Sequence, residues 1–189
     1  MSKSPLCTPF ENTLLKTDRI RLSLFTEDKT DLLFNHMFAS IPNDGEIRQL
    51  MRAKFEKSLA EDSILLFLIY NEDGDFIGYI ELKDLNDIPE IGLDLAEKFR
   101  SKGYGYEACK LLLGKAFDVT DSEYIQYNVF QYNEASIALA KKLGGIFIGN
   151  RSTFEALKKA DDVSEDIKKN AEQFDMLQYR IYKNDFKNE

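Results

Sequence analysis

The sequence predicts a mixed α+β fold, because it contains two kinds of strand connection. Apolar stretches over residues 64–70 and 76–83 flank Asn71-Glu72-Asp73-Gly74, a turn sequence typical of an antiparallel hairpin. A predicted strand, a helix and a second strand follow, over residues 90–95, 104–118 and 124–130. Strands joined through a helix are normally parallel, so the sheet that holds all four strands is expected to be mixed.

The composition fits a single domain over residues 1–189. A chain of 189 residues with 43% hydrophobic residues can bury one substantial core. The formal net charge of −8 argues against nucleic-acid binding, which depends on Lys and Arg contacts to phosphate. No apolar run approaches the length of a membrane span, and residues 1–10 do not resemble a secretory signal. We therefore expect a cytoplasmic protein with no nucleic-acid or membrane partner.

The cysteines and the single histidine do not indicate a metal site. Cys7, Cys109 and His36 are too few for a disulfide framework or a metal cluster, so no metal is expected. Cys109 is expected to be a small helix residue rather than a catalytic thiol. His36 falls on a predicted helix face, where a histidine more often packs or meets solvent than carries chemistry.

The first part of the chain is expected to contain an arm, one strand and two helices. Alternation of Ile20, Leu22 and Leu24 with polar residues predicts the half-buried strand. Apolar residues at helical spacing predict the two helices, and Thr26 can cap the first of them. In order, these elements are an irregular arm over 1–16, a strand over 17–24, a helix over 26–40, a turn over 41–45 and a helix over 46–60.

The last part of the chain is expected to add a helix and two strands to the sheet. Asn133 can cap the helix, which covers residues 133–143, and Gly144-Gly145 can end it. A strand is expected to begin at 146–149, and alternation predicts a closing strand over 174–182. The charged segment between them, about 152–172, has few apolar residues, which predicts a mobile or partner-facing insertion.

The junction between the strand at 90–95 and the next helix has the features of an anion site. Gly103 and Gly105 open that helix, where unpaired backbone N–H groups and the helix dipole favour a phosphate. Glycine also permits a positive φ and a close approach of the backbone to a ligand. Arg100 and Lys102 precede the turn and supply counter-charge for a diphosphate.

Two other interpretations of the glycines stay open. A helix can simply start with two glycines, with no ligand involved. Residues 103–108 also match the loose Gly-x-Gly-x-x-Ala pattern of dinucleotide-binding folds. In those folds the first glycine comes directly off the strand, whereas a polar connection over 96–102 intervenes here.

The turn resembles a motif of the GNAT acetyltransferase superfamily. Arg100-Ser101-Lys102-Gly103-Tyr104-Gly105 fits the pattern Arg/Gln-x-x-Gly-x-Gly/Ala, with which that family holds the pyrophosphate of acetyl-coenzyme A. Downstream, Asn133-Glu134-Ala135-Ser136 and Lys142-Leu143-Gly144 resemble the Asn-x-x-Ser and Lys-Leu-Gly-Phe motifs of the ribosomal-protein alanine acetyltransferase branch. The resemblance covers roughly residues 75–150, and it departs at Gly145, where that branch usually has an aromatic residue.

The resemblance implies a fold and a ligand. The implied fold is a central, mixed and mostly antiparallel sheet of about six to seven strands, with helices on both faces. The implied partners are acetyl-CoA as cosubstrate and an amine acceptor, with the protein acting as a monomer or homodimer. The residues expected to bind the coenzyme are Leu93, Asp94, Leu95, Arg100, Ser101, Lys102, Gly103, Tyr104, Gly105, Tyr106 and Asn133.

Acetyl transfer from a thioester to an amine needs a base for the amine and a proton for the departing thiolate. Glu90 is the candidate base, because it lies on the central strand and shares a face with Gly92 and Asp94. Ser136 is the candidate proton donor, since by resemblance it lies near the sulfur. Glu90 could instead be an exposed residue at a strand start, and Ser136 an ordinary hydroxyl of an early helical turn.

The predicted function is an N-acetyltransferase that moves an acetyl group from acetyl-CoA to a primary amine, by direct attack in a ternary complex. The acceptor could be a protein N-terminus or a small-molecule amine. The alternative is a non-catalytic acyl-CoA-binding or sensing domain on the same fold, since an intact phosphate turn fits both.

Overall fold

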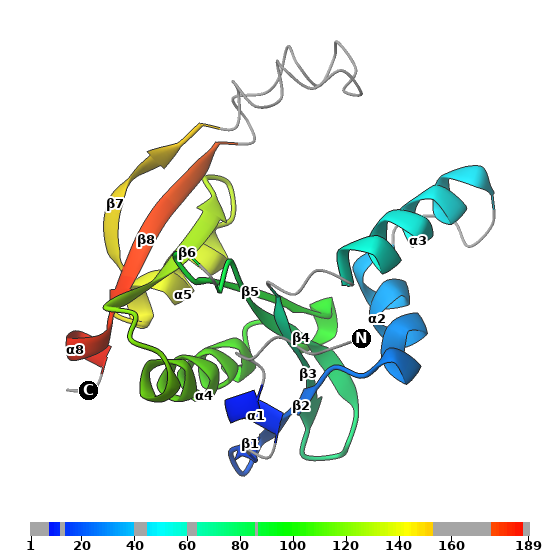
Figure 1. The fold of residues 1–189 in the computed structure, drawn as a ribbon, viewed down its shortest axis with the longest axis horizontal. Coiled ribbons are helices and arrows are strands. Elements are labelled where there is room, and N and C mark those ends of the chain that lie inside the picture. Colours follow the sequence, from blue (N-terminus) through cyan, green and yellow to red (C-terminus); the bar gives the residue numbers. More distant parts are fainter. Residues whose placement is uncertain are drawn as a thin grey trace.

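The computed structural model of the chain contains one sheet with helices on both sides (Figure 1). It describes residues 8–11, 14–39, 45–59, 64–85, 87–152 and 175–186. Most of the charged insertion expected at about 152–172 lies outside the described residues, so the prediction for it stays a prediction. None of the helices in the described ranges is both long enough and apolar enough to cross a membrane.

Within the described residues the sheet has eight strands, in the order β1-β2-β3-β4-β5-β6-β8-β7. Their bounds are β1 Leu15–Lys16, β2 Ile20–Leu24, β3 Leu65–Asn71, β4 Phe76–Lys83, β5 Glu90–Leu95, β6 Tyr124–Phe130, β7 Ile146–Arg151 and β8 Met176–Tyr182. All neighbours are antiparallel except β5 and β6. The predicted mixed, mostly antiparallel sheet is confirmed, and the strand count is slightly higher than expected because a two-residue β1 pairs with β2.

Helices cover both faces of the sheet. Their bounds are α1 Thr8–Glu11, α2 Thr30–Met37, α3 Glu46–Leu59, α4 Tyr104–Val119, α5 Glu134–Lys142 and α8 Lys183–Phe186, with 3-10 turns at Glu27–Lys29 and Glu97–Phe99. Strand β3 shows why two layers are needed, since it is buried on both faces. Leu65, Phe67 and Ile69 belong to the core shared with α4, whereas Leu66 and Leu68 belong to a smaller core shared with α2 and α3.

Two local predictions near the N-terminus are wrong. The helix expected over 26–40 begins at Thr30, after a 3-10 turn, and Thr26 donates its hydroxyl to Asp28 instead of capping the helix. The arm expected to be irregular holds α1 and β1. Phe10 anchors it, because its buried ring packs 6.0 Å from the ring of Phe67.

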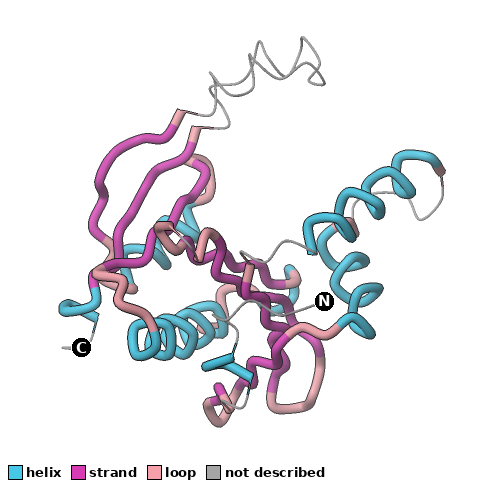
Figure 2. The backbone as a smooth tube through the Cα atoms, viewed as in Figure 1, coloured by secondary structure: helices cyan, strands magenta, loops and turns pink. Residues whose placement is uncertain are grey.

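The sheet opens between its two parallel strands. In the described chain the register between β5 and β6 consists of one pair, Glu90 with Gln126. Beyond it the strands diverge, as Figure 2 shows. Ala96 N donates to Ile77 O of β4 at 2.9 Å. Successive N–H groups along a strand point to opposite sides of that strand, toward one neighbour and then the other. The N–H groups of Leu93 and Leu95 therefore point away from β4, into the opening.

Candidate active site

The turn that leads into α4 carries backbone strain. Gly103, the residue before the helix, has φ +87°, and Ser101 has φ +60°, which is uncommon for a residue with a side chain. For Ser101 this conformation costs about 1–3 kcal/mol, and such strain clusters where a ligand is held, whereas Gly103 adopts a positive φ without that cost. The first N–H groups of α4 have no partner inside the helix, so the turn is suited to an anion.

Gly105 is needed for packing as well as for ligand approach. A Cβ built on Gly105 would lie 3.0 Å from Leu93 Cδ2 and 3.6 Å from Leu139 Cδ2. The start of α4 is therefore seated between β5 and α5, and a larger side chain would push it off β5. The sequence argument gave a positive φ or a close ligand approach as the reason for the two glycines. The positive φ is found at Gly103 and not at Gly105, where packing is the observed constraint.

Arg100 is held against β5. Its Nε donates to Leu95 O at 2.7 Å, and its Nη2 lies 3.0 Å from Asp94 Oδ1. Asp94 Oδ2 in turn lies 2.9 Å from His36 Nε2 on α2. Burial by itself would raise the pKa of Asp94, but its interactions with His36 and Arg100 outweigh burial and hold the pKa below its usual value. Asp94 thus connects the turn that leads into α4 with helix α2.

His36 packs in an aromatic setting. Its ring makes edge contacts with Phe76 at 5.3 Å and Tyr79 at 5.9 Å between centroids. This agrees with the expectation that the histidine packs, yet its contact with Asp94 was not foreseen from the sequence. No local signal reveals that contact, since the two residues come from different layers of the fold.

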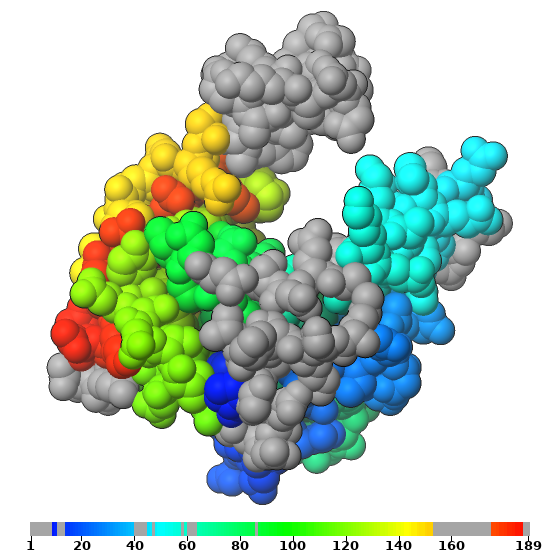
Figure 3. All heavy atoms as spheres, viewed as in Figure 1, coloured from blue at the N-terminus to red at the C-terminus, as the bar shows by residue number. Residues whose placement is uncertain are grey.

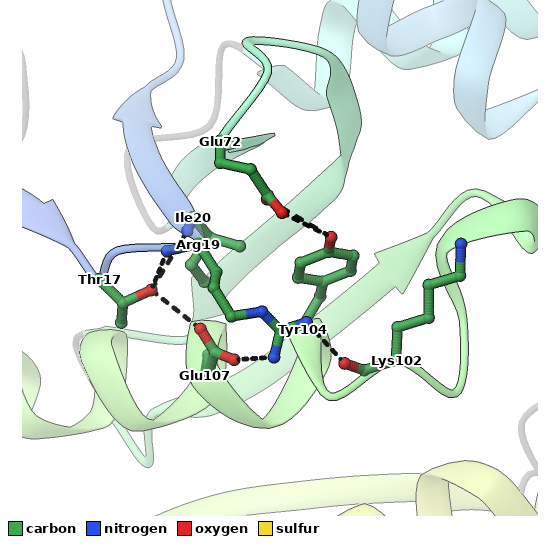
Figure 4. Close-up of polar contacts among 7 residues, drawn as sticks. All are labelled: Thr17, Arg19, Ile20, Glu72, Lys102, Tyr104 and Glu107. Carbon is green, nitrogen blue, oxygen red and sulfur yellow. Dashed lines mark hydrogen bonds and ion pairs between the residues drawn. The ribbon is translucent and has the colours of Figure 1, made fainter.

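The tyrosines of the turn are engaged with charged residues. Tyr104 is buried, its hydroxyl lies 3.4 Å from the nearer Glu72 oxygen, and the Arg19 guanidinium lies 4.5 Å from its ring centre (Figure 4). Tyr106 meets Lys142 of α5, whose Nζ lies 4.3 Å from the ring centre. Tyr104 therefore anchors the turn to the β2 side of the sheet.

Glu90 is a half-buried carboxylate at the point where the sheet opens. Asn128 Nδ2 donates to its Oε2 at 2.5 Å, and Arg151 Nη1 is 4.0 Å from the same oxygen. Burial raises the pKa of Glu90 above its usual value, although Asn128, Lys83 and Arg151 each act to lower it. A carboxylate with a raised pKa is a better proton acceptor than an ordinary surface one.

A second carboxylate lies on the same face as Glu90. A Cβ on Gly92 would be 2.9 Å from Glu81 Oε1, so Gly92 leaves room for Glu81 to extend across β5. Lys83 Nζ is 2.8 Å from that oxygen. With Asp94 farther along, this face of β4 and β5 presents three carboxylates on the side where α2 and α3 lie.

Ser136 is paired with a buried tyrosine. Its Oγ lies 2.8 Å from the Tyr127 hydroxyl, and burial raises the pKa of Tyr127. Asn133 caps α5 as predicted, because its Oδ1 accepts from Ser136 N at 3.1 Å. Sequence reasoning missed Tyr127 as a site residue. Its two-residue spacing from Ile125 and Val129 in a predicted strand does place it on their buried face.

The two candidate catalytic residues lie on opposite sides of the sheet. Glu90 bonds with Asn128 on the face toward α2 and α3, whereas Ser136 meets Tyr127, a member of the core shared with α4. The molecule is hollowed between β7 and α3 on the side drawn in Figure 3. A thioester lying in the opening between β5 and β6 would have one candidate on each side.

Other chemistries find no support in the described ranges. No group of three or more His, Cys, Asp or Glu side chains there is arranged to hold a metal ion. Burial raises the pKa of the Cys109 thiol to about 12, so this cysteine is not a nucleophile at neutral pH.

A family model described as an acetyltransferase (GNAT) domain matches residues 17–146. The chain therefore belongs to the GNAT acetyltransferase family. No curated protein sequence gives a significant match.

Solved structures agree on the fold. A chimera of the spermidine N-acetyltransferase SpeG from Vibrio cholerae and hSSAT has a TM-score of 0.67 at 15% identity, over 90% of this chain and 99% of that chain. The Vibrio cholerae spermidine N-acetyltransferase in complex with CoA and spermine has a TM-score of 0.65 at 13% identity, over 91% and 100%. A probable acetyltransferase reaches 0.65 at 19% identity, over 91% and 98%. Identities this low show a shared fold.

Proposed function

We propose that the protein is an N-acetyltransferase that uses acetyl-CoA and a primary amine in a ternary complex. The observation that carries the proposal is the opening between β5 and β6. It meets the strained turn into α4 and has a carboxylate on one face and a hydroxyl on the other. Membership of the GNAT family supports the same reaction class.

The residues of the turn fit acetyl-CoA as cosubstrate. The N–H groups at the start of α4 would hold the pyrophosphate, with Gly103 supplying the positive φ. Lys102 would add positive charge beside it. The N–H groups of Leu93 and Leu95 face the opening and are suited to hydrogen bonds with the extended arm and the thioester carbonyl, where negative charge develops. Arg100 and Asp94 would hold β5 and the turn together rather than contact the ligand.

Glu90 would take the proton from the attacking amine, directly or through water. Burial raises the pKa of Glu90, and a carboxylate with a raised pKa accepts a proton more readily. Asn128 holds the carboxylate by donating to Oε2, which leaves Oε1 for the substrate.

Ser136 would deliver the proton to the departing thiolate. Its hydroxyl can accept a hydrogen bond from Tyr127 and donate its own proton away from it. Tyr127 stays protonated because burial raises its pKa, so it would act as a positioning residue.

The carboxylates of Glu81, Glu90 and Asp94 could accept hydrogen bonds from a cationic acceptor on the face of β4 and β5 that meets α2 and α3, with their charge partly offset by Lys83, Arg151 and Arg100. Both a polyamine and a protein N-terminus carry a positive charge. The Vibrio cholerae structure in complex with CoA and spermine supports including polyamines among the candidates. The resemblance to ribosomal-protein alanine acetyltransferases supports including peptides with a free N-terminus.

The test is release of free thiol from acetyl-CoA in the presence of spermidine, spermine, peptides with a free N-terminus and an aminoglycoside. We expect thiol release with at least one amine, matched by an acetylated product in mass spectrometry. Tight coenzyme binding with no thiol release for any amine would favour the alternative, an acyl-CoA sensor.

A further inference from the structure

We infer that Arg19 is a positioning residue for the coenzyme, a role that rests on the proposed function. Arg19 directly precedes β2 and is far in sequence from the turn that would hold the pyrophosphate. Its guanidinium reaches across to that turn and to the first helical turn of α4 (Figure 4).

Three contacts fix the guanidinium. Nη2 donates to Lys102 O at 2.8 Å, Nη1 donates to Glu107 Oε1 at 2.6 Å, and the guanidinium carbon lies 4.5 Å from the Tyr104 ring centre. A Cβ on Gly103 would be 3.5 Å from Nη1, so the group lies directly against the turn. Binding the Lys102 carbonyl fixes the peptide unit between Lys102 and Gly103, and therefore the direction of the N–H groups that follow.

The second effect of Arg19 is electrostatic. Glu107 lies in the first turn of α4, where its carboxylate stabilises the empty helix but would repel an anionic ligand at the same helix end. Arg19 pairs with that carboxylate and cancels its charge. The protein thus keeps a carboxylate near the phosphate turn without the penalty that it would otherwise impose on coenzyme binding.

Thr17 completes the arrangement on the β2 side. Its Oγ1 donates to Glu107 Oε2 at 2.9 Å and accepts from the backbone N–H of Arg19 and Ile20 at 3.1 Å each. Glu107 therefore has a neutral partner on one oxygen and a charged partner on the other. Only Arg19 supplies positive charge among the contacts described for Glu107 in this part of the chain.

The experiment is calorimetry of CoA binding to four proteins at low salt. Arg19→Gln removes the charge and is expected to weaken CoA binding about tenfold, since a charge-assisted contact is lost and Glu107 is left uncompensated. Arg21→Gln is the matched control, because Arg21 lies two residues further along the chain, in β2, and stacks on Tyr70, 4.9 Å from the ring centre. Its affinity for CoA is expected to match the wild type.

The decisive variant is Arg19→Gln with Glu107→Gln. Removing both charges is expected to recover most of the lost affinity, although the double variant still lacks the guanidinium contact to Lys102 O. A merely structural role for Arg19 would not produce this rescue, because neutralising Glu107 restores no contact. Thermal unfolding of each variant shows whether it is folded at the assay temperature.

Two outcomes would overturn the inference. One is wild-type affinity in folded Arg19→Gln, and the other is a double variant that binds as weakly as, or more weakly than, Arg19→Gln. If the wild-type protein itself does not bind CoA, the proposed function fails and the inference falls with it. If the wild-type protein binds CoA and the Arg19 variants bind it with the same affinity, the proposed function stands and only the role of Arg19 is removed.

Discussion

The two faces of β5 are built in different ways. On the face toward α4, Leu93 and Leu95 pack against Gly105, and the positive φ angles of the turn belong to Ser101 and Gly103, two positions in one short stretch of chain. On the face toward α2, Glu90 is held by Asn128 and Asp94 is held by His36, partners that come from distant parts of the sequence.

Under the proposed function, this difference would separate coenzyme binding from acceptor chemistry. The face proposed for the coenzyme depends on backbone conformation and close packing, which few residue types satisfy. The face proposed for the acceptor depends on paired side chains, which can be exchanged without moving the backbone. Substitutions on the first face should therefore affect affinity for the coenzyme, and those on the second should affect turnover, pH dependence and choice of amine.

The largest effect is expected from Gly105→Glu. The new side chain would meet Leu93 and place an unpaired charge at the phosphate turn, so affinity for CoA should fall about 100-fold or more. Calorimetry measures the affinity. The matched control is Gly114→Ala in the same helix, where the added Cβ would lie 3.8 Å from Phe186 Cε1. That control should bind CoA normally and gain about 0.5–1 kcal/mol of stability.

Glu90→Gln tests the other face and should lower kcat/KM about 100-fold at neutral pH, because the amine loses its proton acceptor. The raised pKa of Glu90 sets the sign of the pH dependence. In the wild type, kcat/KM should fall as the pH drops through that pKa and the carboxylate becomes protonated. In the variant this acid arm should disappear, and activity should recover at high pH, where the amine is already deprotonated. An unchanged pH profile would assign the base to another group.

Ser136→Ala is expected to lower kcat by about 10- to 100-fold, since a thiolate is a good leaving group and needs only modest help. Affinity for CoA should stay unchanged, because a proton donor acts in the transition state. Tyr127→Phe should cause a smaller loss of kcat, as the serine keeps its hydroxyl but loses its partner. Full turnover in Ser136→Ala would mean that the proton comes from water or another residue.

Asp94→Asn is expected to have the smallest effect, a loss of about 1 kcal/mol of unfolding free energy at pH 7, because the carboxylate is still 38% exposed. The pKa of Asp94 is lowered in the folded protein, so its ion pairs stabilise the fold above the unfolded-state pKa. That contribution is lost as the pH falls through the folded-state pKa. Urea unfolding should therefore show the variant and the wild type converging in acid. Asp28→Asn, an exposed pair with Lys29, is the control and should change little.

Much of the fold could be predicted from the sequence, because the patterns that specify it are local. The hairpin of β3 and β4, the glycine turn, the helix α4 and the Asn133 cap are each encoded within a few neighbouring residues, and the structure contains them all. The predicted start of the helix α2 was wrong, because the Thr26 hydroxyl bonds to Asp28 instead of capping the helix. Strand β1 was missed because two residues are too few to show a period.

The candidate site was less accessible to sequence reasoning. Alternation along β5 correctly placed Glu90, Gly92 and Asp94 on one face. It could not reveal that Asn128, Glu81 and His36 meet them, since those contacts depend on how strands and layers are packed. The pairing of Ser136 with Tyr127 has the same origin, and so does the contact of Arg19 with the coenzyme turn.

Under the proposed function, the opening between β5 and β6 would also make folding stability depend on ligand concentration. The N–H groups of Leu93 and Leu95 face a gap where a central strand would normally find its neighbour, so this side of β5 is an edge in the middle of the sheet. An extended ligand with amide groups that enters the gap supplies the missing partner, and it can do so only in the folded state. Saturation at 100 times Kd would add about 2.7 kcal/mol to the unfolding free energy. The apparent melting temperature of this protein should therefore rise with the concentration of acetyl-CoA.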